Sequence, residues 1–487
     1  MTEKITMIEL FSGIGAQERA LRQLNIPYKI INTCDCDKDA VLSYTAMRFD
    51  LNNEIASYPF PSAEDMIFDL QSKNVGYDFI KGKHTITTRT SIDKLKQYYL
   101  ADKLSHNLGD IGKVERLPYA DMVTYSFPCT DLSVAGKGEG MQNKCNSCGH
   151  SWPIDFSSAD EVLICPNCDE KVSSSTRSGL LGQVQRLLAV AYENNELPKY
   201  LLLENVKNLV GKKFVNQFNA WVKWLDSIGY NTYYEVLNAK HYGIPQNRER
   251  IFAVSIRKDV DDGTFKFLDK IPLNIRLKDM LEKNVDEKYY LPDERIEKIL
   301  NSTFVQEKKR IQMKDVCDTL LARDWKDPKC VQVAEPIIYD DYNSRISSDQ
   351  DAINTLTTNC GASAERNGVK ILEPIVCEER RDEGIRFFKD DCIGTLRTID
   401  ACGDKRVLEP KHNIRYRIRK LTEKESWRLM GFTDSEHDRA AQYVSASARY
   451  KQAGNSICTC CLISIFNALF LQDYNTSYAN KLVDYNS

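Results

Sequence analysis

The chain has 487 residues, enough to bury a large core and to divide into two or three domains. Its formal net charge of −3 excludes a generally basic surface, so any affinity for nucleic acid must come from a local patch. The N-terminus lacks the pattern of a secretory signal, and no apolar run approaches the roughly 18 residues of a membrane span. We therefore expect a cytoplasmic protein whose 16 cysteines are reduced, unless they bind a metal or take part in catalysis.

The first 262 residues alternate strand-like and helical patterns. Strands are predicted for the short apolar runs at 5–11, 28–35, 121–127, 199–206 and 250–256. Strands separated by helices indicate βαβ units, so we expect an α/β fold with a parallel, doubly wound, Rossmann-like sheet. The polar segment 50–105 shows little periodicity, and we interpret it as an insertion without an assigned role.

Beyond residue 262 the sequence becomes more polar and repeats itself. Three segments, which begin with Thr-Leu at 319, 355 and 395, share the order Thr-Leu, polar loop, short strand and Glu-Pro. Such a period predicts a repeated supersecondary unit. We therefore assign 263–444 to a smaller, strand-rich domain, and 1–262 together with 445–487 to the first domain. At the end of the chain the apolar stretch 456–470 predicts a helix that packs on the sheet.

Two further local patterns lie near the end of the second domain. The basic stretch 405–420 includes Arg415, Arg417 and Arg419, which we expect to contact phosphates. Directly after it, Thr422 and Glu425 have the spacing of a capping box, so a helix is predicted to begin there.

The turn "FSGIGA" (11–16) joins the first strand to the first helix. Gly13 and Gly15 allow a tight turn and close approach of a ligand, and Asp35, at the end of the second strand, can bind ribose hydroxyls. Position 18 holds Glu where a dinucleotide site has its third glycine, and a carboxylate there opposes a pyrophosphate. The turn therefore favours a nucleoside cofactor without phosphates, such as S-adenosylmethionine.

Four reactive side chains follow predicted strands or lie in polar turns. They are Cys129 in "PCTDLS", Glu204 in "ENV", and Arg248 and Arg250 in "QNRER". At the carboxyl edge of a parallel sheet they would converge on the ligand crevice. A thiolate that adds to carbon 6 of cytosine makes carbon 5 nucleophilic, provided that an acid such as Glu204 protonates N3. Carbon 5 could then accept a methyl group.

The ordered blocks of this chain resemble the motifs of the DNA cytosine-5 methyltransferases of bacteria and phages. The blocks span residues 8 to about 465 and read "FSGIGA", "GDI", "PCTDLS", "ENV", "QNRER", "RKLTEKESWRLMGF" and "AGNSI". The resemblance implies methyl transfer from S-adenosylmethionine to carbon 5 of a cytosine that is flipped out of a specific duplex site. It also implies a second domain that recognises the DNA sequence.

The resemblance further implies the roles of individual residues. Cys129 would be the nucleophile and Glu204 the partner of N3, while Arg248 and Arg250 would hold the target base and the active-site carboxylate. The cofactor pocket would be lined by Phe11, Ser12, Gly13, Gly15, Asp35, Cys36, Asp110, Ile111, Pro128, Leu180, Asn455 and Ser456. The chain departs from the family at Thr130, where Gln is common, and at Cys36, where an aromatic side chain is common.

Two CxxC pairs interrupt the segment that follows Cys129. Their cysteines are Cys145, Cys148, Cys165 and Cys168, within an insertion that we place at 142–172. Paired CxxC motifs at this distance predict a zinc ribbon in which four thiolates hold one structural zinc ion. Two disulfides or four free thiols are the alternatives, and the family resemblance does not explain the insertion.

Two other functions are compatible with the same scaffold. One is methylation of cytosine in RNA such as tRNA, and the other is a catalytically silent DNA-binding protein. The large second domain favours double-stranded DNA as the partner, and the intact Cys129, Glu204 and arginine pair favours an active enzyme. We expect a monomer without a membrane partner, with a cognate restriction endonuclease as a functional partner.

Overall fold

The computed structural model describes residues 4–128, 132, 141–145, 147–154, 156, 164–170, 177–290, 317–320, 322, 330–334, 337–340, 345–347, 369–372, 377–380, 384–387, 405–406 and 416–473. The chain divides into two compact units, which we describe separately. The first contains Met1–Lys283, Lys314–Pro328 and Thr422–Ser487, and the second contains Asn284–Met313 and Lys329–Leu421.

The expected domain boundaries at 263 and 444 both fall inside the first unit. Phe265 and Leu268 are buried there, and the Leu268 carbonyl accepts a hydrogen bond from the hydroxyl of Tyr242. The backbone N–H of Glu282 donates to the carboxylate of Glu425 at the start of helix α10 (2.7 Å). Residues 263–283 and 422–444 thus pack with the first unit, although their sequences are as polar as the repeats.

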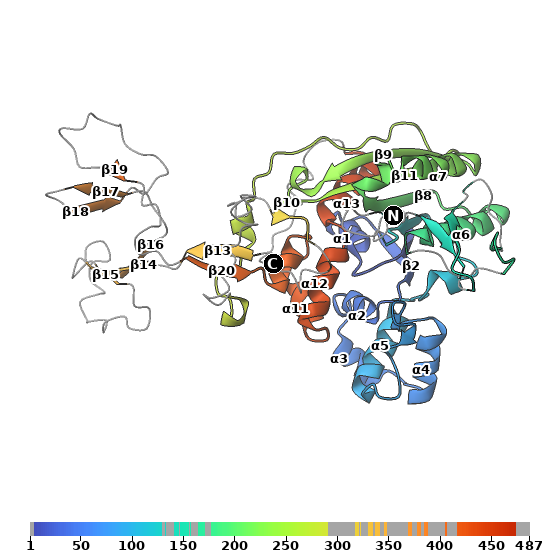
Figure 1. Ribbon diagram of the computed structural model, residues 1–487, viewed down its shortest axis with the longest axis horizontal. Helices are drawn as coiled ribbons and strands as arrows, with labels where there is room; N and C mark the ends of the chain where they lie inside the picture. The colour runs from blue at the N-terminus through green and yellow to red at the C-terminus, as the bar shows by residue number, and fades with distance from the viewer. Residues whose placement is uncertain are drawn as a thin grey trace. The chain divides into compact units, whose positions relative to one another are not determined.

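A six-stranded mixed sheet forms the centre of the first unit, in the order β2-β1-β5-β8-β11-β9 (Figure 1). The strands are β1 (Ile5–Leu10), β2 (Tyr28–Cys34), β5 (Met122–Tyr125), β8 (Tyr200–Val206), β9 (Tyr230–Asn238) and β11 (Glu249–Arg257). β2, β1, β5 and β8 are parallel to one another, which confirms the α/β class. Their carboxyl ends meet at one edge, where parallel sheets of this kind bind ligands.

The direction of β11 differs from the expectation of a fully parallel sheet. β11 is antiparallel to both β8 and β9, with Arg250 opposite Val206 and Phe252 opposite Glu204. β9, which the sequence analysis did not predict, is joined to β11 by a connection of only 239–248, too short for the crossover that parallel neighbours need. The amino end of β11 therefore lies at the edge that holds the carboxyl end of β8.

Helices cover both faces of the sheet. On one face, alternate residues such as Ile8, Val123 and Leu203 share a core with α6 (Leu181–Glu193) and α7 (Val215–Ser227). On the other face Glu9 accepts a hydrogen bond from the start of α1 (Ala16–Gln23), and α1 packs against α13 (Thr459–Phe466). The apolar helix predicted over 456–470 is thus confirmed, as α13 and the π-helical turn Asn467–Leu471.

The segment that we interpreted as an insertion without a role is mostly helical. It contains α3 (Leu51–Ser57), α4 (Ala63–Ser72), the hairpin of β3 (Tyr77–Asp78) and β4 (Lys83–His84), and α5 (Ile92–Leu104) (Figure 1). α4 and α5 pack against each other, and α5 packs against α2 (Lys38–Ala46). Together with α2, the segment buries a hydrophobic cluster that includes Met66, Leu70, Leu95 and Leu100.

The C-terminal helices of the first unit are α10 (Glu423–Arg428), α11 (Asp434–Ala441) and α12 (Ala446–Asn455). The predicted capping box is confirmed: the Thr422 hydroxyl accepts from the backbone N–H of Glu425, whose carboxylate accepts from that of Thr422. Among the described residues no single helix is long and apolar enough to span a membrane. The bent pair of α12 and Thr459–Leu471 passes that test only when its two parts are combined.

The described part of the second unit consists mainly of short antiparallel strands. A strand precedes each Glu-Pro: β13 (Cys330–Ala334), β16 (Val369–Leu372) and β19 (Lys405–Arg406). A strand also follows each Glu-Pro: β14 (Ile337–Asp340), β17 (Cys377–Arg380) and β20 (Tyr416–Lys420). The pairs are β14 with β16, β17 with β19, and β20 with β13. The strand that follows one Glu-Pro thus pairs with the strand that precedes the next Glu-Pro. The strand after the last Glu-Pro pairs with the strand before the first. The repeated unit of the sequence is therefore a repeated structural unit.

One side chain of the basic stretch differs from its expected role. Arg419 lies in β20 and is only 1 % exposed. A guanidinium buried to this extent is not available to a phosphate group. Arg419 is therefore withdrawn from the expected phosphate contacts, while Arg415 lies outside the described residues.

Candidate active site

The turn after β1 lies at the edge formed by the carboxyl ends of the parallel strands, in the part where we expect the cofactor. The backbone N–H of Phe11 donates to the carbonyl of Cys34 (2.8 Å), and that of Gly13 donates to the carboxylate of Asp35 (2.9 Å). Gly13 has a φ of +53°, and a Cβ added to it would meet no atom within 4 Å. Ser12, between Phe11 and Gly13, is buried. Open space beside Gly13, next to a carboxylate, fits the ribose end of a nucleoside.

Gly15 is required for a different reason from the one that the sequence suggested. A Cβ at Gly15 would overlap the side chains of Arg48 and Tyr44, so glycine here admits protein atoms rather than a ligand. Arg48 donates to the carbonyl of Gly15 (3.2 Å) and forms an ion pair with Glu18. Glu18 is buried, and its carboxylate also accepts a hydrogen bond from the hydroxyl of Tyr28. Glu18 therefore helps to hold the turn in place.

The two carboxyl groups after β2 have opposite pKa shifts. Burial, followed by repulsion from Asp37, raises the pKa of Asp35 to about 6. For Asp37 burial acts in the same direction, but the ammonium group of Lys451 (2.6 Å) outweighs it and lowers the pKa. Asp37 is therefore a permanently charged cap of α2, whereas Asp35 changes its charge close to neutral pH.

The "GDI" turn lies beside Asp35. The Oδ1 atom of Asp110 accepts from the backbone N–H of Gly112 (2.9 Å), and Ile111 is buried in the core that the sheet shares with α6. Cys34 donates from its thiol to the carbonyl of Gly109 (3.0 Å). Burial, and then the carboxylate of Asp110, raises the pKa of the Cys36 thiol, so this side chain stays uncharged. The expected adenine and ribose contacts thus share one end of the sheet.

The other residues of the expected pocket come from three different segments. Pro128 directly follows Phe127 at the exit of β5, and Leu180 precedes α6. Asn455 is the exposed last residue of α12, and Ser456 is the buried residue after it. Their place in the pocket is an expectation of the family resemblance.

Glu204 and Arg250 lie at the part of the sheet edge where we expect the target base of the DNA. Glu204 lies in β8 and is 6 % exposed, and its Oε1 atom is 3.2 Å from the Nε atom of Arg250. The hydroxyl of Ser126 donates to the other oxygen of Glu204. The antiparallel pairing of β8 and β11 produces this contact, because it brings the start of β11 to the end of β8. The sequence analysis missed Ser126, although it lies three residues before Cys129 in the same motif.

Arg248 contacts backbone carbonyl groups. It is 3 % exposed, and its guanidinium group donates to the carbonyls of Leu320, Gly454 and Ser456 at 2.7 to 3.1 Å. These contacts hold the segment after α12 against the segment around Leu320. The side chain therefore connects parts of the backbone, and its expected contact with the target base stays a prediction.

Cys129 lies outside the described residues, but the segments on either side of it are defined. The amide of Asn205 donates to the carbonyl of Phe127 (3.0 Å), and Leu132, three residues after Cys129, is fully buried. The amide of Asn208 donates to the carbonyl of Leu132 (2.6 Å). The chain around Cys129 is thus attached on both sides to the "ENV" segment that carries Glu204.

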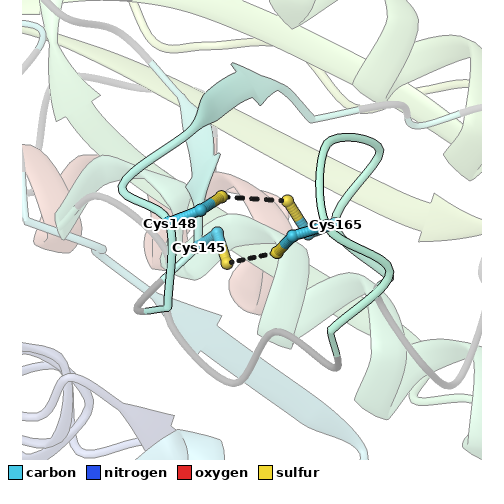
Figure 2. A group of neighbouring side chains, drawn as sticks. Cys145, Cys148 and Cys165 are labelled. Atoms are coloured by element: carbon cyan, nitrogen blue, oxygen red, sulfur yellow. Dashed lines mark hydrogen bonds between the residues drawn. The ribbon is translucent and has the colours of Figure 1, made fainter.

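The two CxxC pairs come together as the spacing predicted. The four sulfur atoms lie within 4.8 Å of one another, and Cys145–Cys168 and Cys148–Cys165 each approach to 3.6 Å. Figure 2 shows Cys145, Cys148 and Cys165 directed toward a common centre. A Zn–S bond of about 2.3 Å implies S–S edges of about 3.8 Å in a tetrahedron, whereas a disulfide measures about 2.0 Å. The arrangement fits a tetrahedral metal site and does not fit two disulfides.

The backbone repeats the same turn in both CxxC pairs. Gly149 donates to the carbonyl of Cys145 (3.0 Å) and Asp169 to that of Cys165 (3.0 Å), and both donors have positive φ. The backbone N–H of His150 and then the amide of Asn167 lower the pKa of Cys148 to about 6. The backbone N–H of Glu170 lowers the pKa of Cys168, but the hydrogen bonds of the neighbouring thiols outweigh it and raise that pKa to about 12. Metal binding requires the thiolates, so it would release protons from this cluster.

Hydrophobic contacts fix the base of the ribbon to the core of the first unit. β6 (Gln142–Lys144) and β7 (Ser151–Pro153) form its hairpin, and Met141 and Phe156 flank it. Both flanking residues are buried in the core that α6 and α7 share with the sheet, where the Phe156 ring lies 5.6 Å from that of Trp221. The amide of Gln217 in α7 donates to the Met141 carbonyl (3.0 Å).

The fold is of the α/β class, and a carboxylate–guanidinium pair lies at one edge of its sheet. Residues 70–148 and 167–471 match the family model described as C-5 cytosine-specific DNA methylase. The chain is 31 % identical to the Type II methyltransferase M2.ScrFI of Lactococcus lactis subsp. cremoris, over 96 % of this chain and 99 % of that one. It is 29 % identical to the orphan methyltransferase M.SPBetaI of Bacillus phage SPbeta, over 98 % and 99 %. Identity to the orphan methyltransferase M.SssI of Spiroplasma monobiae is 34 %, over 59 % and 67 %.

The chain belongs to the C-5 cytosine-specific DNA methylase family. It is a DNA cytosine-5 methyltransferase, and the family uses S-adenosylmethionine as methyl donor. The RNA-methylating and the silent alternatives are not favoured. The family match is interrupted at 149–166, a stretch that lies within the ribbon and includes Cys165.

Proposed function

We propose that Cys129 and Glu204 carry out the chemistry on a cytosine that is flipped out of duplex DNA. The thiolate of Cys129 adds to carbon 6, and Glu204 protonates or hydrogen-bonds N3, which makes carbon 5 nucleophilic. S-adenosylmethionine supplies the methyl group that carbon 5 takes up. Loss of the carbon 5 proton and expulsion of the thiolate then restore the aromatic ring.

The pair formed by Glu204 and Arg250 carries this proposal. A buried carboxylate next to a guanidinium is held in one orientation, and the hydroxyl of Ser126 fixes its second oxygen. The attachment of Phe127 and Leu132 to the segment after Glu204 supports a position of Cys129 near this pair. We propose the expected pocket residues other than Gly15 as the cofactor site, with Asp35 accepting from the ribose hydroxyls and Asp110 from the adenine amino group.

A covalent adduct tests the mechanism directly. In DNA that carries 5-fluorocytosine, the fluorine blocks loss of a proton from carbon 5, so the enzyme should remain attached through Cys129. We expect a gel-stable complex with the wild-type protein and neither adduct nor turnover with Cys129→Ala. A Cys129→Ala variant that still methylates DNA would refute the mechanism.

We further propose that Cys145, Cys148, Cys165 and Cys168 hold one structural zinc ion. The close approach of the four sulfur atoms and the repeated turns support this assignment. Four protein ligands leave no position open for a substrate, so the ion would stabilise the insertion rather than take part in catalysis. Metal analysis of protein purified without chelator should find one zinc ion per chain, and its absence would refute the assignment.

The second unit is our candidate for the reader of the DNA sequence. Its repeated strand pairs, joined by polar connections, form a scaffold that can present several loops to a groove. Replacing the polar segment 357–368 should change which sites are methylated, as measured by bisulfite sequencing of DNA from expressing cells. An unchanged site preference would assign recognition to another segment.

The remaining partners are also proposals. We expect the enzyme to act as a monomer in the cytoplasm of a bacterium or of a phage-infected cell, because its relatives come from such sources. Those relatives include a type II enzyme and an orphan one, and for this chain we keep the proposal of a cognate restriction endonuclease. Light scattering on the purified protein, alone and with duplex DNA, tests the monomer.

A further inference from the structure

The helical segment 51–104 reaches the cofactor end of the sheet through the turn that follows α4. The backbone N–H of Gly76 donates to the carbonyl of Cys36 (2.8 Å), and that of Asp110 donates to the carbonyl of Lys73 (2.8 Å). A Cβ added to Gly109 would overlap that same carbonyl of Lys73. The turn 73–76 is therefore built directly against both segments that carry the proposed adenine contacts.

Asn74, within this turn, fixes the carboxylate of Asp110. Its Nδ2 atom donates to Oδ2 of Asp110 at 2.7 Å, while Oδ1 accepts from the backbone N–H of Gly112 at 2.9 Å. Each carboxylate oxygen thus has a partner in the protein, which sets the plane of the group and leaves further lone pairs for a ligand. Asn74 has a φ of +57°, a conformation that asparagine tolerates better than most residues.

A second connection joins the same segment to Asp35. The amide of Asn107 donates to the carbonyl of Asp35 (3.0 Å) and accepts from the backbone N–H groups of Asp35 (2.9 Å) and Gly109 (3.2 Å). Asn107 is itself held by the carboxylate of Asp102 in α5 (3.1 Å), which forms an ion pair with Lys73 (2.6 Å). The helical segment thus contacts the carboxylate of Asp110 directly, and it reaches the backbone of Asp35 through Asp102 and Asn107.

We propose that Asn74 is a positioning residue that makes the cofactor site selective for adenine. The inference rests on the proposed contact between Asp110 and the adenine amino group. A carboxylate held in one plane can accept from that amino group, whereas hypoxanthine presents a carbonyl oxygen at the same position, acceptor against acceptor. A carboxylate that is free to rotate discriminates less between the two bases.

The test compares S-adenosylhomocysteine with S-inosylhomocysteine, in which a carbonyl oxygen replaces the amino group and N1 carries a hydrogen. Binding of both to the full chain is measured by calorimetry for the wild type, Asn74→Gly and Asp110→Ala. Glycine adopts positive φ freely, so Asn74→Gly removes the amide without straining the turn. We expect Asn74→Gly to bind the adenosine ligand about tenfold more weakly and the inosine ligand almost unchanged, as for loss of one hydrogen bond to a charged group.

A comparison of the wild type with Asn74→Gly and Asp110→Ala shows which part of the inference is wrong if the expected result is not found. If Asp110→Ala loses the discrimination and Asn74→Gly keeps it, the positioning role is refuted and the role of Asp110 stands. If Asn74→Gly weakens both ligands equally, the residue is only structural and the inference is also refuted. If Asp110→Ala keeps the wild-type discrimination, the contact with adenine is wrong and the inference fails with it. Asn74→Asp, which preserves the shape but sets a second carboxylate against Asp110, should lose more affinity than Asn74→Gly.

Discussion

Two segments connect strands of the central sheet, 51–104 between β2 and β5 and 141–170 between β5 and β8, but different interactions hold them. The first has three helices, and its side chains share a hydrophobic cluster with α2. The second has a two-stranded hairpin with two CxxC turns, and its buried anchors Met141 and Phe156 lie only at its base. A segment of about 30 residues has too little core to fold alone, so we expect the second to depend on the proposed zinc ion.

The two segments also serve different ends of the active site. The first contacts the carboxylate of Asp110 through Asn74 and, through Asp102 and Asn107, the backbone of Asp35, both in the proposed cofactor site. The second continues the chain from the segment that carries Cys129 and packs beside α7. Changes in one should therefore affect cofactor binding, and changes in the other should affect the chemical step. The following predictions test this separation, beginning with the largest effect.

Glu204→Gln should lower kcat by about 10²- to 10⁴-fold, because general acid catalysis of this type contributes that much. Cofactor affinity should stay near the wild-type value, since Glu204 lies at the base end of the edge. Steady-state kinetics together with calorimetry checks both parts. Glu235→Gln, which alters an exposed glutamate of β9, is the matched control and should leave kcat unchanged. Near wild-type turnover in Glu204→Gln would remove Glu204 from the mechanism.

Leu100→Ala should reduce the free energy of unfolding by about 2–5 kcal/mol, because Leu100 is fully buried in the cluster of the helical segment. Urea unfolding monitored by fluorescence measures the change. Ile92→Ala in the same helix is the control, since Ile92 is 48 % exposed and should cost less than about 0.5 kcal/mol. Equal effects of the two substitutions would show that this segment has no stabilising core of its own.

Cys145→Ser combined with Cys148→Ser should release zinc and lower turnover by about tenfold, the lower end of what a disturbed metal site costs. S-adenosylmethionine affinity should change less than twofold, because the ribbon does not contact the cofactor carboxylates in the described structure. Metal analysis, methyl-transfer assays and calorimetry provide the three measurements. Ser147→Ala in the same turn controls for local disturbance. A zinc-free protein with unchanged rate and site preference would contradict the proposed dependence on the metal.

Cofactor affinity should weaken as the pH falls below about 6. Asp35 has its pKa raised to about 6 and must be ionised to accept from two hydroxyl groups, so each pH unit below that value should cost up to about tenfold. Asp35→Asn should bind more weakly at pH 8 and show no such decrease. Glu9, whose pKa burial raises to about 7, is present in both proteins, so its contribution cancels. An identical pH dependence in both would exclude Asp35 as the titrating group.

The same pKa shifts set the pH dependence of stability without cofactor. Glu9 and Asp35 ionise at higher pH in the folded chain than in the unfolded one, whose pKa values are near the ordinary 4.5 and 3.8. The stability associated with their protonated forms is therefore present at low pH and is lost as the pH rises through about 6 to 7. Glu9→Gln should flatten that decrease in thermal unfolding experiments.

Much of the fold and of the site was predictable from the sequence. The first strands, the cofactor turn, the capping box at Thr422 and the final helix all depend on neighbours along the chain, and the structure confirms their secondary structure. The Glu-Pro repeats predicted strands that the structure contains. The helical segment 51–104 was missed because its helices are short and its core is shared with α2, so no single helix shows a clear apolar face.

By itself the sequence determined the family of this protein, through the order of the motifs that carry Cys129 and Glu204, and the spacing of four cysteines that fits one metal site. Such patterns are local, so they can be recognised without knowing how the chain folds. Only the tertiary structure decided which side chains meet. The antiparallel direction of β11 brought Arg250 to Glu204, and a turn 36 residues away brought Asn74 to Asp110. Strand direction and contacts between distant segments depend on how the whole core packs, and the periodicity of a strand is the same in both directions.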